Sequence, residues 1–432
     1  MELERLQTAV QATATLPLRG RVTRVTGPVI EAALGGRLGE CVEILTPGLA
    51  PLPAEVVGLR EERIVLLPFG DPTGIGLDSE VIPTGAPPSM RVGDQLVGRI
   101  LDGLGRPIDG WPLPPGLEEW SLDRAAPDPL RRAPVRRPLP LGVRALDGLT
   151  TMGEGQRLGL FAGSGVGKST LLGQIARTAQ ADRVVLCLVG ERGREVREFV
   201  EGALGAEGLR RSVLVVATSD APALLRLKAA HAATAIAEWF AERGARVLFM
   251  LDSITRYARA LREVGLAAGE PAARQGYPPS VYSALPRLLE RTGNRERGSI
   301  TALYTVLVAG GDMDEPIADE VRGILDGHVV LERRIAAAGR FPAVDVLQSL
   351  SRVMPAVASA RHLAAASRLR ALLAAHERVR ELIPIGAYRP GSDAEADAAL
   401  ARLPAIEAFL RQPVEEATPF EAAVAGLEEL VA

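Results

Sequence analysis

The middle of the chain alternates short apolar runs with longer stretches in which apolar residues recur at helical spacing. The apolar runs fall at residues 158–162, 184–189, 213–217, 247–251 and 301–308, and each has the length of one strand. Strands that alternate with helices in this way form a mostly parallel sheet with helices on both faces. The pattern therefore predicts an α/β domain in this part of the chain.

The two flanks of this region follow other patterns. Between residue 21 and about residue 90, short β-rich runs at 22–25, 41–45 and 64–67 are broken by glycine and proline, which is typical of a small β-barrel. Beyond about residue 354, the sequence is rich in alanine, leucine and arginine with a helical period. That composition predicts a helical bundle at the C-terminal end.

Two further segments carry weaker patterns. Prolines recur throughout 111–140, so we predict a stiff connector without regular elements there. Near the start, Leu3, Leu6 and Val10 lie on one face of a helical pattern. This face favours docking on a partner or a membrane surface, and a frayed terminus is the alternative interpretation.

Composition narrows the class of protein. Apolar residues make up 47% of the chain and charged residues 24%, which fits neither a disordered chain nor a membrane protein. The longest apolar stretch, 301–311, is shorter than the roughly 18 residues that cross a bilayer, and the first residues lack the basic region of an export signal. Cys41 and Cys187 have neither metal nor disulfide-framework spacing. We therefore expect a cytoplasmic protein.

Charge and histidine spacing exclude other classes of site. The net charge of −3 provides no global attraction for nucleic acid, and we expect no nucleic-acid partner. The four histidines are scattered, without cysteine or carboxylate companions at ligand spacing. A zinc site and a serine-type triad are therefore not expected.

A phosphate-binding loop is the strongest local motif. Residues 162–169 read AGSGVGKS, directly after an apolar run and directly before the helical stretch 170–177. The glycines let backbone N–H groups curl round phosphates, Lys168 adds positive charge, and the Ser169 hydroxyl can ligate Mg²⁺. Ala162 stands at the usual first glycine, and alanine still fits a tight turn.

Charged residues at the ends of other apolar runs extend this site. Asp252 follows the run 247–251 and is the natural holder of Mg²⁺, because open α/β sheets bind ligands at the carboxyl ends of their strands. Glu191 and Arg192 follow the run 184–189, so Glu191 could orient an attacking water, although a solvated ion pair in a turn is the alternative. Arg352 lies far along the chain, and its spacing alone indicates a surface arginine.

These residues belong to a longer series of ordered blocks, at 23–32, 98–110, 161–172, 189–199, 252–271, 276–281, 314–334 and 341–354. With them the chain resembles the ATPases of type III secretion and flagellar export, relatives of the rotary ATP synthase α and β subunits. The likeness spans residues 21–412. It implies a central RecA-like ATPase domain and the domain plan 1–20 docking segment, 21–95 oligomerisation barrel, 96–354 ATPase domain and 355–432 helical domain.

The resemblance implies the roles of the loop and the metal site. ATP and Mg²⁺ would be the ligands, and Asp252 would hold the metal with Ser169. The nucleotide would be bound by the loop residues Gly163, Ser164, Gly165, Val166, Gly167, Lys168, Ser169 and Thr170.

The remaining roles are also implied by resemblance. Glu191 would be the catalytic carboxylate, assisted by Lys168. Arg192 and Arg256 resemble contacts to the γ-phosphate, and Arg352 resembles an arginine finger supplied by a neighbouring subunit. Phe341 matches the aromatic position that stacks on adenine, whereas core packing would otherwise be preferred for it.

The resemblance further implies an assembly and its partners. One chain carries both Glu191 and Arg352, which favours a homohexamer whose interfaces are all active. The expected partners are a stator or regulator protein at the N-terminus, a central stalk protein, an export gate at the inner membrane, and chaperone–substrate complexes. The loop 311–315 resembles the segment that touches the central stalk in relatives. The ring would lie in the cytoplasm, peripheral to the inner face of the membrane.

Several alternatives stay open at this point. The segments 258–271 and 319–328 favour an injectisome over a flagellar export apparatus. A rotary synthase subunit would need a distinct partner chain, and an RNA translocase would need a basic and aromatic face that the composition does not favour. A chain that binds nucleotide only as an assembly switch would have no use for Glu191 and Arg352.

Overall fold

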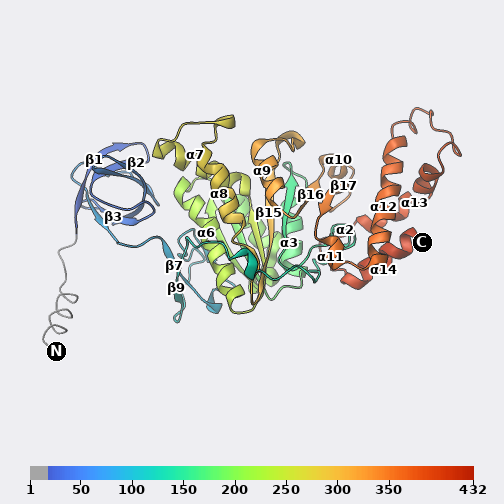
Figure 1. The fold of residues 1–432 in the computed structure, drawn as a ribbon, viewed down its shortest axis with the longest axis horizontal. Helices are drawn as coiled ribbons and strands as arrows, with labels where there is room; N and C mark the ends of the chain where they lie inside the picture. Colours follow the sequence, from blue (N-terminus) through green and yellow to red (C-terminus); the bar gives the residue numbers. More distant parts are fainter. Residues whose placement is uncertain (1–17) are drawn as a thin grey trace. The chain divides into compact units, whose positions relative to one another are not determined.

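The computed structural model describes residues 18–432 (Figure 1). The described residues divide into two compact units, one reaching to Pro88 together with 264–270, the other Ser89–Glu263 with Pro271–Ala432. The predicted docking face of Leu3, Leu6 and Val10 lies outside the described residues. Among residues 18–432, no helix combines the length and apolar character needed to span a bilayer.

The first unit contains a closed β-barrel, as predicted. Its strands follow the order β1-β2-β5-β4-β3-β6, and β1 pairs with β6 to close the barrel. The alternation of side chains explains the fold, since in β3 Val42 and Ile44 are buried while Glu43 faces out. Gly27, with φ of 57°, supplies the tight turn between β1 and β2. The strands are β1 (Gly20–Thr26), β2 (Val29–Ala33), β3 (Cys41–Leu45), β4 (Leu52–Arg60), β5 (Arg63–Pro68) and β6 (Glu80–Pro83).

The second unit is built on a nine-stranded sheet, which confirms the predicted mostly parallel architecture. Its main path runs β17-β16-β10-β15-β13-β11-β12-β8, with β14 paired to β15; only the pairs β16/β17 and β14/β15 are antiparallel. The strands are β8 (Ile100–Leu101), β10 (Arg157–Ala162), β11 (Arg183–Glu191), β12 (Ser212–Thr218), β13 (Arg246–Asp252), β14 (Gly293–Asn294), β15 (Ser299–Leu307), β16 (Gly327–Leu331) and β17 (Val344–Ser351).

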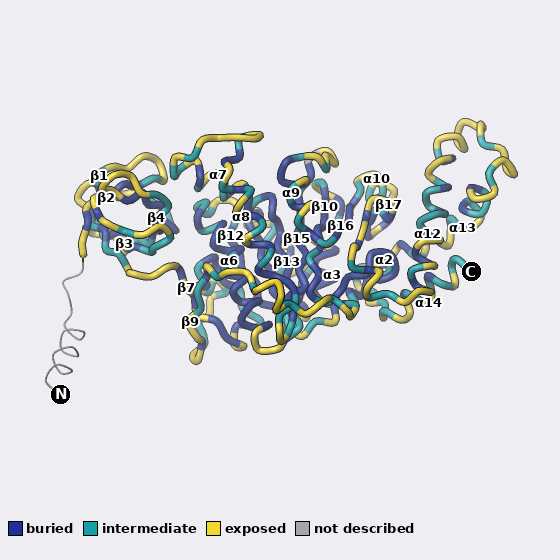
Figure 2. The backbone as a smooth tube through the Cα atoms, viewed as in Figure 1, coloured by how far each residue is buried: buried dark blue, intermediate teal, exposed yellow. Residues whose placement is uncertain are grey.

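Both faces of the central strands are buried, which explains why their sequences are continuously apolar rather than alternating. On one face, Leu186 of β11 and Leu248 of β13 join the core cluster that includes Leu171 of α3 (Lys168–Thr178). Their neighbours in the chain point to the opposite face, and α6 (Ala223–Glu242) packs on β11, β12 and β13. Figure 2 shows the resulting run of buried backbone through this sheet.

The proline-rich connector was predicted without regular elements, and that prediction is wrong in part. The structure forms β9 (Glu118–Ser121), which pairs antiparallel with β7 (Ser89–Val92), and a 3-10 turn at η2 (Pro129–Arg131). The strand falls in 116–126, a gap between prolines that leaves the backbone N–H groups free to pair. The prediction used the proline content of the whole segment 111–140, which does not reveal this gap.

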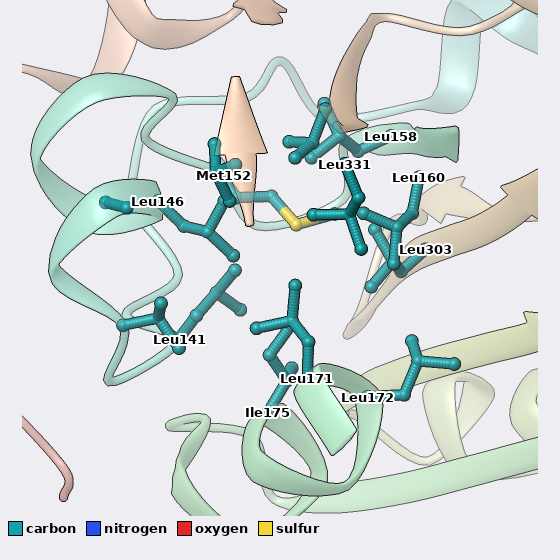
Figure 3. Close-up of a cluster of buried hydrophobic side chains, with 14 of the residues drawn as sticks. Leu141, Leu146, Met152, Leu158, Leu160, Leu171, Leu172, Ile175, Leu303 and Leu331 are labelled. Atoms are coloured by element: carbon teal, nitrogen blue, oxygen red, sulfur yellow. The ribbon is translucent and has the colours of Figure 1, made fainter. Parts of the chain in front are cut away.

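The C-terminal end of the chain is helical, as predicted, and packs on the sheet domain through a common core. Its main helices are α12 (Ala360–Val379), α13 (Ala394–Leu410) and α14 (Phe420–Val431), and all three contact α2 (Arg144–Leu149). Figure 3 shows how Leu171 and Ile175 of α3 lie among Leu141 and Leu146 of the α2 region. The helix that begins at the phosphate loop is thus held by the same core as the C-terminal helices.

Candidate active site

The parallel sheet brings the predicted site residues to one edge. Strands β10, β15, β13 and β11 are consecutive neighbours, so the chain leaves each of them at the same carboxyl edge. The phosphate loop follows β10, Asp252 ends β13 and Glu191 ends β11. Lys168 and Asp252, which are 84 positions apart in the sequence, therefore lie within hydrogen-bonding distance of each other.

The phosphate loop has the backbone that its sequence predicts. Gly165 and Gly167 adopt positive φ values of 79° and 83°, a conformation that residues with a Cβ adopt only with strain. Helix α3 begins immediately afterwards at Lys168, so its first N–H groups have no partners within the helix. Such a helix start, with the positive end of its dipole, is suited to bind phosphate.

Lys168 lies between two carboxylates. Its Nζ donates a hydrogen bond to Oδ1 of Asp252 and lies 3.7 Å from Oε1 of Glu191. Asp252 is further held by Thr305 on the neighbouring strand β15, whose hydroxyl donates to Oδ1 at 2.7 Å. One ammonium group thus faces two buried acidic side chains.

Glu191 is the least satisfied member of this group. Arg256 pairs with its Oε2 at 2.9 Å, but its buried Oε1 accepts no hydrogen bond from the described part of the chain. Burial, followed by repulsion from Asp252, raises the pKa of Glu191 to about 7, although Lys168 and Arg256 act in the opposite direction. A carboxylate with a pKa near neutrality and an oxygen that accepts no hydrogen bond within the protein is suited to accept one from water.

A cavity of about 770 Å³ opens beside these residues, and Ser169, Glu191 and Asp252 line it. We call it the acidic cavity, because its lining carries six carboxylates and one guanidinium. The charged lining residues are Arg177, Glu191, Glu195, Glu198, Glu207, Asp252 and Glu415.

The acidic cavity fits a magnesium ion bound together with phosphates. Mg²⁺ takes oxygen ligands and usually keeps several waters, with one or two protein ligands and substrate phosphates completing its shell. Ser169 and Asp252 supply one hydroxyl and one carboxylate, and among residues 18–432 no group of three or more histidines, cysteines and carboxylates is arranged to hold a metal alone. The ion would therefore depend on a bound nucleotide.

The three arginines and Phe341 are placed differently from one another. Arg256 joins the acidic group, whereas Arg192 is exposed and pairs with Glu195 at 3.2 Å. Arg352 follows β17, donates to the Leu325 carbonyl at 3.3 Å, and has no hydrogen bond or ion pair to Lys168, Glu191 or Asp252 in the described structure.

Phe341 lies beside the phosphate loop. Its ring is 3.2 Å from the point that a Cβ would occupy at Gly167, and the side chain is 45% exposed. A buried core role is therefore excluded for this ring. Its position next to the loop fits a surface on which a base could stack.

Sequence reasoning missed Thr305. The run 301–308 was treated as an apolar strand, yet Thr305 is fully buried and bonded to Asp252. A hydroxyl residue near the carboxyl end of a buried strand was the available sign of a polar role. That Thr305 contacts Asp252 is known only from the pairing of β13 with β15.

Comparison with known proteins places these features in a family. Residues 22–85 match the ATP synthase alpha/beta family β-barrel domain, 142–351 its nucleotide-binding domain, and 358–429 the T3SS EscN ATPase C-terminal domain. The three matches follow the barrel, the sheet and the C-terminal helices of the structure in order.

Similar full-length proteins carry two kinds of name. The flagellum-specific ATP synthase of Bacillus subtilis is 50% identical, over 100% of this chain and 99% of that protein. The type 3 secretion system ATPase of Xanthomonas euvesicatoria is 52% identical, over 93% and 91%. The assembled ATPase EscN of enteropathogenic E. coli, solved in complex with its central stalk EscO, superposes with a TM-score of 0.89 at 48% identity, over 96% of this chain and 100% of that one. The chain therefore belongs to the family of type III secretion and flagellum-specific ATPases, within the broader ATP synthase alpha/beta family.

Proposed function

We propose that this protein hydrolyses MgATP at the subunit interfaces of a homohexameric ring and so powers type III protein export. The observation that carries the proposal is the free, buried oxygen of Glu191 beside the Lys168–Asp252 pair. A structural ion pair gains nothing from an unsatisfied carboxylate oxygen, whereas a hydrolase needs an acceptor that orients water. Membership of an ATPase family supports the same conclusion.

Different groups of this chain bind the phosphates, hold the metal ion and orient the attacking water. The loop N–H groups and Lys168 bind the phosphates, and Ser169 with Asp252 would hold the magnesium ion, which neutralises charge on the phosphate oxygens when bound. Glu191 accepts a hydrogen bond from water and directs its oxygen at the γ-phosphorus. The new P–O bond forms as the bond to ADP breaks, ADP leaves with that electron pair, and the water proton is released with the products.

Arg352 completes the site from a neighbouring copy in this proposal. Within the described residues it forms no hydrogen bond or ion pair with Lys168, Glu191 or Asp252, and its side chain donates to the Leu325 carbonyl. An arginine supplied across an interface stabilises the charge of the transition state. Arg192 and Arg256 would contact the γ-phosphate from the same subunit, and Phe341 would stack on adenine.

The partners follow from the export role. The EscN–EscO complex supports a central stalk protein as a partner of this ring, and the loop 311–315 is the proposed contact. We further propose a stator or regulator at the N-terminus, an export gate at the inner membrane, and chaperone–substrate complexes that the ring separates and unfolds. The ring would work in the cytoplasm, peripheral to the inner face of the membrane, with no nucleic-acid partner.

The first test measures MgATP hydrolysis against protein concentration, beside a measurement of particle size. Specific activity should rise steeply as rings assemble and should fall on the order of 10³-fold or more in Arg352→Ala. Arg361→Ala, at an arginine that pairs with Glu428 far from the site, is the matched control and should keep wild-type activity. Activity that is independent of concentration and of Arg352 would overturn the shared site.

Mixed rings test action in trans directly. Subunits with Arg352→Ala keep an intact phosphate loop, and subunits with Lys168→Ala keep an intact Arg352. Some interfaces in a mixed ring therefore combine an intact phosphate loop from one subunit with an intact Arg352 from its neighbour. Activity should reappear on mixing. If no mixing ratio restores it, Arg352 does not act across an interface.

The type of apparatus needs a cellular test, because relatives of both kinds are equally similar. We propose the injectisome, on the basis of the amino-acid sequences of the segments 258–271 and 319–328. The gene should restore secretion in a strain that lacks its injectisome ATPase and leave a strain without its flagellar export ATPase non-motile. The reverse result would assign the protein to the flagellum.

A further inference from the structure

A second hollow lies at the carboxyl edge of the sheet, with a volume of about 280 Å³. We call it the arginine hollow, because four arginines line it against a single carboxylate, Glu263. The arginines are Arg192, Arg226, Arg256 and Arg259, and they come from the end of β11, from α6 and from α7 (Ile254–Ala268). The proposed catalytic group uses Arg192 and Arg256 and leaves Arg226 and Arg259 without a role.

The positive charge of the hollow is only partly compensated. Glu263 pairs with Arg226 at 2.5 Å, and Arg192 is paired with Glu195. Arg259 is exposed and forms no ion pair with any residue in 18–432. Its guanidinium can therefore take an anion without giving up a partner.

Arg256 forms the wall between the arginine hollow and the catalytic carboxylate. It lines the hollow, donates to the Gly190 carbonyl and pairs with Glu191 at 2.9 Å. The hollow and the catalytic carboxylate thus share this one side chain. The acidic cavity on the other side carries six carboxylates, which repel an anion that has lost its metal.

We propose that the arginine hollow binds the inorganic phosphate product of hydrolysis, with Arg226 and Arg259 as its binding residues. This inference rests on the proposed function. Guanidinium groups match phosphate oxygens in charge and in their paired donor geometry. The opposite charges of the two spaces separate the products, because metal and nucleotide stay with the carboxylates while phosphate moves to the arginines.

The test is product inhibition of MgATP hydrolysis by inorganic phosphate and, separately, by ADP. Arg259→Gln and Arg226→Gln should each raise the inhibition constant for phosphate about tenfold, the change expected when one charge-assisted hydrogen bond is lost, and leave that for ADP unchanged. Arg194→Gln removes an exposed arginine on α4 (Gly193–Glu198), outside both spaces, and should change neither constant. Arg259→Gln alters only an exposed side chain, so it remains informative if Arg226→Gln fails to fold.

Two results would overturn the proposal. One is an unchanged phosphate constant in both variants. The other is loss of ring assembly without any change in phosphate inhibition, which would mean that the hollow holds a carboxylate of a neighbouring copy.

A direct binding measurement separates this inference from the proposed function. The ³¹P resonance of inorganic phosphate, recorded with MgADP present, should broaden with wild-type protein and not with Arg226→Gln or Arg259→Gln. If the wild type binds phosphate in this way but hydrolyses no ATP, the hydrolase proposal fails and the anion site stands. If neither wild type nor variants broaden the line, the anion site fails whatever the hydrolysis rate.

Discussion

Two buried charge clusters lie in the same domain. We call the first balanced because both oxygens of its carboxylate accept hydrogen bonds, and the second unbalanced because one carboxylate oxygen accepts none. Glu238 of α6 receives two hydrogen bonds from Arg291, at 3.0 and 2.8 Å, and a second cation, Arg295, lies 3.4 Å from its Oε1. At the sheet edge, Lys168 and Arg256 face Asp252 and Glu191, and one oxygen of Glu191 has no hydrogen bond. The balanced cluster joins elements of the fold, whereas the unbalanced one is left ready to interact with a ligand.

The largest expected effect is on catalysis at the unbalanced cluster. Glu191→Gln keeps the shape of the side chain but removes the acceptor charge, so kcat should fall on the order of 10³-fold while ATP still binds. Hydrolysis rates and nucleotide binding should be measured on the same preparation. Glu198→Gln, at an exposed residue of the same acidic cavity, is the control. Normal turnover in Glu191→Gln would remove the water-orienting role.

The balanced cluster should respond in stability instead. Glu238→Gln leaves the buried Arg291 guanidinium without its counter-charge, and the free energy of unfolding should drop by about 3 kcal/mol. Denaturant unfolding of wild type and variant measures this, and the double variant Glu238→Leu with Arg291→Met should recover part of the loss. Glu191→Gln should not destabilise the protein. A large fall in kcat of correctly folded Glu238→Gln would contradict the assignment of this cluster to stability rather than catalysis.

The pH dependence follows from the raised pKa of Glu191, to about 7. In the proposed mechanism the working form is the carboxylate, so kcat/KM for MgATP should fall about fivefold between pH 7 and pH 6 as Glu191 takes up a proton. Because its folded pKa lies above the ordinary glutamate value of 4.5, ionisation of Glu191 lowers the stability of the folded state above pH 7, and that stability returns as the pH falls towards 4.5. A flat profile of kcat/KM between pH 6 and 7 would show that Glu191 has an ordinary pKa.

The smallest expected effect is at Thr305, which orients Asp252. Thr305→Val keeps the volume and removes the hydrogen bond, which is worth about 1 kcal/mol, so the Mg²⁺ concentration for half-maximal activity should rise about fivefold. Thr305→Ser should restore the wild-type Mg²⁺ requirement because it restores the hydroxyl. If Thr305→Ser behaves like Thr305→Val, the lost methyl packing explains the effect and the hydrogen bond does not.

Local sequence predicted most of the architecture. The apolar periods predicted the barrel, the parallel sheet and the C-terminal helices, and the loop 162–169 predicted its own glycine conformations. These features depend on neighbours in the chain. The strand β9 was missed because proline content was judged over thirty residues rather than position by position.

Features that depend on tertiary neighbours could not be predicted in the same way. Thr305 meets Asp252 only because β15 lies next to β13. Likewise Arg226 and Arg259 line one hollow with Gly190 only because α6 and α7 bring them to the end of β11. No spacing in the sequence encodes these encounters.

The pairing of Lys168 with Asp252 has a consequence for how the site distinguishes its ligands. In the proposed mechanism Lys168 turns to a phosphate, and Asp252 then loses that cation while it stays buried, which costs free energy. A divalent ion that arrives with the nucleotide replaces the lost charge at once. Under the proposed function, the two side chains would therefore favour metal and nucleotide bound together over either one alone.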